Sequence, residues 1–549
     1  SVSLQEKFHV QNNFPSIVPV PSVLPRIIRL PDVSEANSRH CFVFLEDMLM
    51  FYAARFFVGY DLLEARAFRI TRDADLYIDE EDAQDLVVEV ERQLKKRQRG
   101  QAVRLEFEVG TSRFMRRFMT QEMNLEKEDM YQIDGPLDMT VFFGFCGIKG
   151  YNHLRYPEAH PHSPWSMLEL KRTPETNIFD MIREKDLLIH LPYESFDESV
   201  VNFLYSAAND KDVLAIKQTL YRVSSSSPVV QALEKAVQNG KQVTVLMEVK
   251  ARFDEANNIL MARRLEKAGA HVIYGLVGLK THSKCTLVIR REKDGIRRYV
   301  HVATGNYNAS TAKLYTDLGI LTCNDRFGID ASAFFNLLSG YSDPPIWDSF
   351  IVAPINLRQR CIELIDREIH FAKNGEDAHM IAKMNSLLDK GIIEKLYEAS
   401  QAGVKIELIV RGICVLIPGI PGASDNITVR SIVGRFLEHS RIFWFRNGGR
   451  EELYISSADW MPRNLNDRVE LMVPIEDPEI KRRLKQMVDI ELSDNQKAHI
   501  MQADGTWLKT ISAENQLCAQ EYFQKIAEKR DAEDEMTLAQ KLEPYTPVL

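Results

Sequence analysis

The sequence has few cysteines for its length, and none of them is arranged for a metal site or a disulfide framework. Seven cysteines are spread over 549 residues, and no two of them form a Cys-x-x-Cys pair. Such pairs are typical of zinc sites and redox motifs, and disulfide frameworks need cysteines at a much higher density. We therefore expect buried, reduced thiols in a cytoplasmic protein.

Long hydrophobic segments and an excess of basic residues are also missing. No run of about 18 uninterrupted apolar residues occurs, so the sequence predicts no membrane-spanning helix. The formal net charge is −9 and the sequence pI is about 5.9, which excludes the global positive field of a dedicated nucleic-acid-binding protein. A site for a polyanion must then be a local pocket of positive charge.

Two common kinase signatures are absent as well. The sequence contains neither Gly-x-x-x-x-Gly-Lys-Ser/Thr nor the His-Arg-Asp catalytic loop, which excludes P-loop kinases and protein kinases. Its 45% hydrophobic and 27% charged residues are those of an ordinary globular protein. At this length we expect two to four domains.

A histidine followed by a base and an apolar segment occurs twice. The first copy is 280–284 (KTHSK), which leads into the β-branched segment 285–289. We expect a short buried strand here, with His282 and Lys284 on one face, because residues two apart on a strand point the same way. The second copy is 438–441 (EHSR), followed by the apolar segment 442–445. A nucleophilic nitrogen beside a fixed cation suits phosphoryl transfer.

The segments upstream of these two copies repeat too. In each, a helix-like segment ends in glycine and leads into an apolar strand, 229–240 before 243–248 and 392–403 before 406–411. The glycines Gly240 and Gly403 are 403 − 240 = 163 positions apart, and the two histidines are 439 − 282 = 157 apart. An offset that changes so little indicates an internal duplication.

The duplication predicts both the fold class and the place of the site. Duplicated α/β halves usually pack about a pseudo-twofold axis, with ligands beyond the carboxyl ends of the strands. We expect an α+β head domain over residues 1–165, a first α/β domain over 166–345, and a second over 346–549 that ends in a helical tail. The two histidines would then share one site. This layout resembles the phospholipase D superfamily, whose two histidines are nucleophile and acid–base partner in phosphoryl chemistry.

Two arginines follow predicted strands of the first half. Arg222 ends the segment 215–222, and Arg252 lies just beyond the strand that ends near Glu248. Ligand contacts in α/β folds concentrate at this position, and guanidinium groups bind phosphate oxygens well. A second interpretation of Arg252 is a surface ion pair with Asp254 or Glu255.

Six segments together resemble bacterial polyphosphate kinases of the histidine-phosphorylating type. They are 214–222 (LAIKQTLYR), 251–255 (ARFDE), 278–284 (GLKTHSK), 304–308 (TGNYN), 314–317 (LYTD) and 456–461 (SSADWM). The likeness extends over essentially the whole chain, from the middle domain of that family through both carboxyl-terminal domains. The family's helical amino-terminal domain, which contacts the nucleotide base, has no counterpart, and the chain opens without Met. We therefore expect a truncated chain.

The resemblance implies roles for residues of both copies. His282 is the nucleophile that becomes phosphohistidine, and His439 is the partner histidine, which contacts ATP and acts as acid–base group. Tyr315 and Arg411 bind the nucleotide.

Lys284, Asn306 and Asn308 belong to the same cofactor-binding set. Arg222 and Arg252 stand where the family's magnesium site is recorded. Because a guanidinium group has no acceptor atom, we expect both arginines to grip phosphate oxygens beside a Mg²⁺ held mainly by phosphates and water.

The implied activity is reversible transfer of the γ-phosphoryl group of ATP to the end of an inorganic polyphosphate chain, with Mg²⁺ as cofactor. An imidazole with a free pKa of about 6.5 is largely neutral near pH 7 and can act as nucleophile. The implied partners are ATP or ADP and polyphosphate, not nucleic acid. The family also suggests a homodimer or tetramer in the cytoplasm, with peripheral association at the inner membrane in some members.

Two other functions stay open at this point. The first is a phospholipase D-like phosphodiesterase or transferase; its motif has Asp five residues after the lysine, where this sequence has Ile289, and Arg441 replaces the lysine of the second copy. The second is a catalytically idle scaffold that binds polyanions through the same arginines. The presence of both histidines favours the kinase.

Overall fold

The structure is a computed structural model of the chain, and it describes residues 2–6, 13–31, 40–73, 86–97, 100–168, 176–251, 254–276, 278–340 and 346–541. The chain forms two compact units. One consists of Ser1–Ile78 and Glu91–Glu158, and the other of Asp79–Val90 and Ala159–Leu549.

The amino-terminal unit combines small sheets with short helices, as expected for an α+β fold. Its strands are β1 (Val2–Glu6), β2 (Asn13–Ser16), β3 (Ile27–Arg29), β4 (Phe42–Phe44), β5 (Tyr60–Ala65), β6 (Phe68–Arg72), β7 (Ala102–Glu108) and β8 (Met130–Ile133). They form three sheets, ordered β2-β1-β5, β3-β4 and β6-β7-β8. The helices of this part of the chain are α1 (Leu45–Phe51), α2 (Leu86–Arg97) and α3 (Arg113–Met123).

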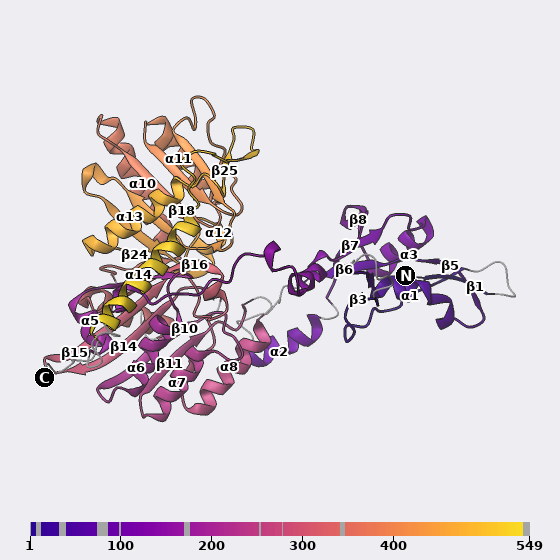
Figure 1. Cartoon of the computed structure of the whole chain (residues 1–549), viewed down its shortest axis with the longest axis horizontal. Coiled ribbons are helices and arrows are strands. Elements are labelled where there is room, and N and C mark those ends of the chain that lie inside the picture. Colours follow the sequence, from indigo (N-terminus) through magenta and orange to yellow (C-terminus); the bar gives the residue numbers. More distant parts are fainter. Residues whose placement is uncertain are drawn as a thin grey trace, which may run out of the picture. The chain divides into compact units, whose positions relative to one another are not determined.

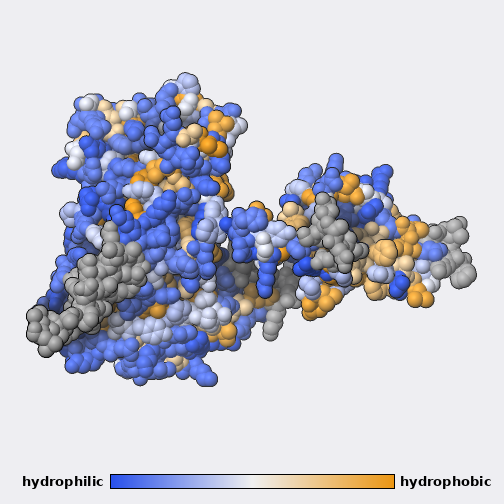
Figure 2. Space-filling model, viewed as in Figure 1, coloured by the Kyte–Doolittle hydropathy of each residue, from blue (hydrophilic) through white to orange (hydrophobic). Residues whose placement is uncertain are grey.

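Several large hydrophobic side chains of this unit are exposed. Val23 is 89% exposed, Val58 90%, and Phe51 and Phe143 80% each. Figure 2 shows hydrophobic residues gathered in patches on the same unit. Exposed apolar patches of this kind are typical of surfaces that contact other chains or ligands.

The second unit contains two α/β halves. The first half has strands β9 (Leu187–Leu191), β10 (Val213–Leu220), β11 (Gln242–Met247), β12 (His271–Ile273), β14 (Cys285–Glu292), β15 (Gly295–Ala303) and β16 (Tyr315–Thr322). Its helices are α5 (Ile178–Glu184), α6 (Asn202–Asn209), α7 (Pro228–Gln238), α8 (Glu255–Ala268) and α9 (Asp325–Leu338). Figure 1 shows α6, α7 and α8 beside the strands β10 and β11.

The second half follows the same plan. Its strands are β17 (Ile351–Ala353), β18 (His379–Met384), β19 (Lys405–Val410), β20 (Ile427–Ile432), β22 (Ile442–Phe445), β23 (Glu452–Ser456), β24 (Arg468–Pro474), β25 (Ala498–Met501) and β26 (Trp507–Lys509). Its helices are α10 (Leu357–Lys373), α11 (Lys390–Gln401), α12 (Pro462–Asn466), α13 (Pro478–Leu492) and α14 (Ala519–Lys541). No helix among the described residues has the length and apolar character that crossing a membrane requires.

The two sheets repeat each other strand by strand. The first has the order β12-β11-β10-β14-β15-β16 with β9 beside β16, and the second has β20-β19-β18-β22-β23-β24 with β17 beside β24. In both, the first three strands are parallel and the next three are antiparallel. The predicted duplication, and with it the α/β fold class, is therefore confirmed.

Equivalent helices of the two halves also begin and end alike. The side chain of Ser227 accepts a hydrogen bond from the first turn of α7, and Asp389 does the same for α11. Such capping satisfies amide groups that the helix itself leaves free. Gly240 and Gly403 follow these helices in the chain. Their φ angles are +79° and +100°, which glycine adopts without strain.

Two short strands are exchanged between the halves. β13 (Lys280–Thr281), just before the first histidine, pairs in parallel with β24 of the second half. β21 (Leu437–Glu438), just before the second histidine, pairs in parallel with β16 of the first half. Each histidine segment is thus fastened to the sheet of the opposite half.

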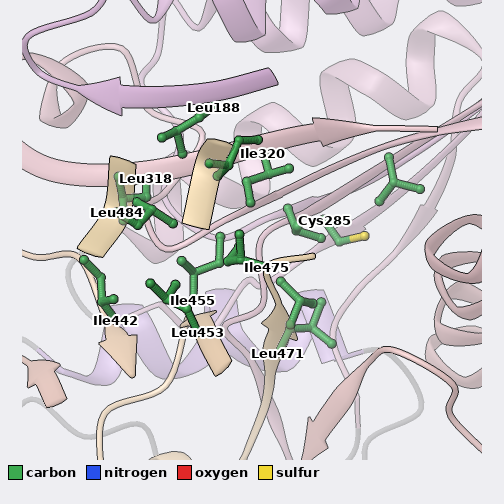
Figure 3. Close-up of a cluster of buried hydrophobic side chains, with 14 of the residues drawn as sticks. Leu188, Cys285, Leu318, Ile320, Ile442, Leu453, Ile455, Leu471, Ile475 and Leu484 are labelled. Carbon is green, nitrogen blue, oxygen red and sulfur yellow. The ribbon is translucent and has the colours of Figure 1, made fainter. Parts of the chain in front are cut away.

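A hydrophobic core that both halves share fixes this arrangement. Figure 3 shows side chains from β9, β14 and β16 packed with others from β22, β23, β24 and α13. Leu318 is 1% exposed, Leu453 1% and Leu484 0%. Because such a core is close-packed, the two sheets cannot shift independently without opening voids.

Candidate active site

The first histidine lies between two strands rather than on one. β13 ends at Thr281 and β14 begins at Cys285, so the prediction that His282 and Lys284 share a strand face was wrong. The chain pairs first with β24, where the amides of His282 and Ser283 both donate to the carbonyl of Val469 at 2.9 Å, and it must turn before joining β14. Within this turn the Lys284 ammonium donates to the carbonyl oxygen of His282.

A carboxylate from the opposite half orients the His282 ring. Nδ1 lies 2.9 Å from the Glu470 carboxylate, which belongs to β24 and is fully buried. Glu470 also accepts from the Ser457 hydroxyl and the Asn464 amide, each at 2.5 Å. A carboxylate at Nδ1 fixes the proton on that nitrogen and leaves the lone pair on Nε2. His282 therefore presents Nε2 as its nucleophilic atom.

Burial and nearby cations keep His282 neutral. Burial is the main cause that lowers the pKa of His282 well below its usual value, and Lys284, Arg468 and Arg441 lower it further. Burial also raises the pKa of Glu470, although Lys284 and Arg468 oppose the change. Glu470 is thus disposed to accept a proton that His282 gives up.

The second histidine has an equivalent partner. Nδ1 of His439 lies 2.9 Å from both carboxylate oxygens of Asp317, on β16 of the first half. Asp317 also accepts from the Thr304 hydroxyl at 2.6 Å. Burial alone would raise the pKa of Asp317, but His439, Thr304 and Arg441 outweigh burial and lower it. For His439, burial is the main cause that lowers the pKa, and Arg441 adds to it although Asp317 opposes the change.

Each histidine thus receives its carboxylate from the other half. Glu470 and Asp317 are 470 − 317 = 153 positions apart, and their hydroxyl donors Ser457 and Thr304 are also 457 − 304 = 153 apart. The two constellations are equivalent under the duplication. The charge of His439 acts on the pKa of His282, so the structure brings both histidines into one region.

The basic residues that follow the histidines differ. One guanidinium nitrogen of Arg441 lies 3.3 Å from Nδ1 and 3.2 Å from Nε2 of His439, hence over the ring, and Arg441 pairs with Asp459 at 3.1 Å. The residue equivalent to Asp459 is Asn306 (459 − 306 = 153). No carboxylate among the described residues lies within ion-pair distance of Lys284, and burial lowers its pKa to about 7.

The residues expected to bind the nucleotide lie beside His439. The Tyr315 ring is 5.2 Å from the His439 ring. Arg411 donates through Nε to the Asn385 side chain at 2.6 Å, and Asn385 in turn donates to the carbonyl of His439 at 3.3 Å. Tyr315, at the start of β16, thus contacts the second histidine directly, whereas Arg411, just after β19, is linked to it through Asn385.

The remaining expected residues occupy the loops around the site. Arg222 forms an ion pair with Asp254 at 3.1 Å. Asn308 donates to the carbonyl of Arg222 at 3.1 Å and accepts from the amides of the next turn, so its side chain shapes a loop. The buried Oδ1 of Asn306 has no hydrogen-bond partner in the described part of the chain. Arg252 lies outside the described residues.

Comparison with known proteins gives one consistent result. Three family models match: the polyphosphate kinase middle domain over residues 1–145, C-terminal domain 1 over 177–344 and C-terminal domain 2 over 350–520. A curated polyphosphate kinase from Halalkalibacterium halodurans is 52% identical over 486 residues, which cover 88% of this chain and 68% of the relative. The chain belongs to the polyphosphate kinase family.

Other members of the polyphosphate kinase family agree. The relative from Staphylococcus epidermidis is 47% identical over 515 residues, which cover 93% of this chain and 69% of the relative. The crystal structure of polyphosphate kinase from Porphyromonas gingivalis superposes with a TM-score of 0.82 at 32% identity, covering 97% of this chain and 78% of that one. The fold expected from the sequence is thus that of the polyphosphate kinase family.

Some residues of this polyphosphate kinase site escape reasoning from sequence alone. Glu470 and Arg468 stand in an apolar strand, where neither looks functional, and Asn385 follows the strand β18 without a motif of its own. A usable signal exists in the duplication. Adding the offset of 153 positions to Asp317 gives Glu470, and adding it to Tyr315 gives Arg468.

Proposed function

We propose that this chain transfers the γ-phosphoryl group of ATP reversibly to the end of an inorganic polyphosphate chain, with His282 as the residue that carries the phosphoryl group. The observation that carries the proposal is the His282–Glu470 pair, with Nδ1 engaged at 2.9 Å and Nε2 left as nucleophile. The family of the chain supports the substrates, since its relatives are polyphosphate kinases.

In the first step Nε2 of His282 attacks the γ-phosphorus. The new N–P bond forms as the bond to the bridging oxygen breaks, and its electron pair leaves with ADP. The Nδ1 proton moves toward Glu470, whose pKa is raised by burial. Lys284, Arg441 and Arg468 balance the charge that spreads over the equatorial oxygens.

In the second step a terminal oxygen of polyphosphate attacks the phosphorus on His282. The N–P bond breaks, its electron pair returns to Nε2, and the proton returns from Glu470 to Nδ1. Tyr315 and Arg411 hold the nucleotide beside His439. When a protonated terminal phosphate attacks, Nε2 of His439 accepts its proton, and in the reverse reaction His439 returns that proton to the same oxygen. Both substrates are phosphoanhydrides, so the reaction runs in either direction.

A magnesium ion bound mainly by phosphates and water fits these residues. The described residues contain no group of three or more His, Cys, Asp or Glu side chains that could hold a metal ion. Asp317, Asp459 and Glu470 already accept hydrogen bonds from protein groups. A bound Mg²⁺ would neutralise phosphate charge, and Arg222 would hold phosphate oxygens.

We also infer that residues 166–345 and 346–549 are the two catalytic domains, each of which supplies one histidine. A homo-oligomer is supported by the exposed hydrophobic side chains of the amino-terminal unit, such as Val58 and Phe143. Light scattering after size-exclusion chromatography tests the oligomer.

The decisive experiment uses ATP labelled at the γ-phosphate, with Mg²⁺. We expect acid-labile, base-stable label on the wild type and none on His282→Ala, and the label must pass to polyphosphate when the acceptor is added. Label that persists on His282→Ala would move the nucleophile elsewhere. A wild type without label, in a chain that includes any further amino-terminal domain, would favour a diesterase or a scaffold.

A further inference from the structure

The ring of Tyr221 packs against the ring of the proposed nucleophile, His282. Tyr221 follows β10 directly, and hydrogen bonds hold the end of this strand against the His282 segment. The Thr219 hydroxyl donates to the carbonyl of Ser283 at 2.9 Å and accepts from the amide of Cys285 at 3.0 Å. The carbonyl of Tyr221 accepts from the Asn258 side chain at 3.3 Å. The backbone on either side of Tyr221 is thus fixed relative to His282.

The Tyr221 ring contacts three groups of the site. Its centroid lies 4.8 Å from that of the His282 imidazole, with the two planes at 86°. The Lys284 ammonium lies 5.5 Å from the ring centroid and the Arg222 guanidinium 5.6 Å. T-shaped ring pairs and cations over aromatic faces are both attractive. The ring therefore contacts the proposed nucleophile and two cations that we expect to bind phosphate.

The hydroxyl of the same residue is unused by the protein. Within the described ranges, no side chain or backbone group forms a hydrogen bond with it, and it is not among the buried polar atoms without a partner. Tyr221 is partly exposed, so this hydroxyl can reach a ligand. Burial is the main cause that raises its pKa, which keeps the proton on the oxygen and makes it a donor at neutral pH.

We propose that Tyr221 is a further catalytic residue of the phosphoryl-transfer site. Its ring holds the His282 imidazole, and its hydroxyl donates a hydrogen bond to a non-bridging oxygen of the phosphoryl group on Nε2. This inference rests on the proposed function, because it needs a phosphoryl group at His282. No bond other than this hydrogen bond forms or breaks, and the proton stays on the tyrosine oxygen.

The ring and the hydroxyl are separable by substitution. Tyr221→Phe keeps the ring and removes only the donor, so we expect the rate of phosphoenzyme formation to fall by roughly 10²-fold, the loss typical of removing one donor to transition-state charge, with little change in KM for ATP. Tyr221→Leu also removes the ring. We expect a further loss and an altered pH profile, because His282 is then less well oriented. Tyr205→Phe is the matched control, since the Tyr205 hydroxyl makes only a 3.5 Å contact with Gln231.

The measurement is the rate at which γ-labelled ATP labels the enzyme, with thermal unfolding to show that each variant is folded. The ³¹P chemical shift of the phosphohistidine is a second readout, and Tyr221→Phe should change it if the hydroxyl contacts the phosphoryl group. A Tyr221→Phe rate and shift equal to the wild type would overturn the proposal while leaving the phosphohistidine in place. A wild type without any label would overturn the proposed function and this inference together.

Discussion

Glu470 binds His282 at 2.9 Å across a separation of 188 residues and across the boundary between the two halves. The reverse pair, Asp317 with His439, spans 122 residues in the opposite direction. Neither half therefore contains a complete histidine–carboxylate pair. A site built in this way exists only when both halves are packed together.

The first prediction concerns Glu470. Glu470→Gln retains the size of the side chain but loses the charge that fixes the Nδ1 proton and that accepts it during transfer. We expect phosphoenzyme formation to slow by roughly 10- to 100-fold, the usual effect of removing an orienting partner, with the label still on His282. The rate of phosphoenzyme formation is measured by stopping the reaction with γ-labelled ATP at a series of times. Glu476→Gln serves as control because Glu476 pairs with Arg326 at the surface; equal rates in both variants would contradict the role of Glu470.

The second prediction concerns pH and Lys284. Its pKa is lowered to about 7 by burial, so its positive charge is present below pH 7 and is lost above it. The pH profile of kcat/KM reports groups of the free enzyme. We expect kcat/KM for ATP to fall above about pH 7, because the phosphate groups of ATP then no longer meet a positive charge on Lys284.

Lys284→Arg separates this group from others that titrate. A guanidinium keeps its charge at these pH values, so the alkaline fall should disappear or move well above pH 8 in this variant. The exposed Lys293, replaced by arginine, is the matched control and should follow the wild type. An unchanged alkaline limb in Lys284→Arg would assign it to another residue.

The duplication was readable from sequence because it leaves a nearly constant offset between glycines, histidines and strands. The histidines His282 and His439 follow from this offset and from the bases beside them. The exchange of two short strands between the halves could not be predicted in the same way. It depends on β13 and β21 pairing with the opposite sheets, and two-residue strands carry too little pattern to show their partners. For the same reason the strand-face geometry predicted for His282 and Lys284 was wrong.

Glu470 could not be recognised as a functional residue from the sequence, for a different reason. A glutamate in the apolar segment 469–473 reads as an interruption of a buried strand, since buried carboxylates without partners are costly. Only the fold shows that Ser457, Asn464 and His282 all donate to it. Reasoning from the sequence identifies nucleophiles more readily than the groups that orient them.

The third prediction tests the shared core. Leu318 of β16 is 1% exposed and packs among residues of both halves. We expect Leu318→Ala to lower the free energy of unfolding by about 2–5 kcal/mol and to slow phosphoenzyme formation, because both carboxylates depend on this packing. Urea unfolding measures the first effect. Leu260→Ala is the matched control, since Leu260 is 58% exposed, and it should alter neither property; equal destabilisation of both variants would contradict the shared core.

A buried ionic cluster next to the second histidine leads to the fourth prediction. Lys383 lies between Glu438, which it contacts at 2.6 Å, and Glu491. Burial is the main cause that raises the pKa of Glu491 to about 7 from 4.5, and the nearby Glu438 adds to it although Lys383 opposes it. Two carboxylates thus share one lysine in the interior.

The sign of the pH effect follows from the raised pKa. The folded protein binds the Glu491 proton more tightly than the unfolded chain does, so the contribution of this group to stability is full below pH 4.5 and is lost as pH rises through about 7. Glu491→Gln cannot titrate. We therefore expect the free energy of unfolding of Glu491→Gln, minus that of the wild type, to increase from pH 5 to pH 8. This holds whether the variant is more or less stable than the wild type at pH 5. Urea unfolding at several pH values measures this change, and Asp489→Asn, which alters an exposed carboxylate on the same helix that pairs with Lys485, should show none. A parallel pH dependence of Glu491→Gln and wild type would mean that Glu491 stays ionised throughout this range, and it would contradict the prediction.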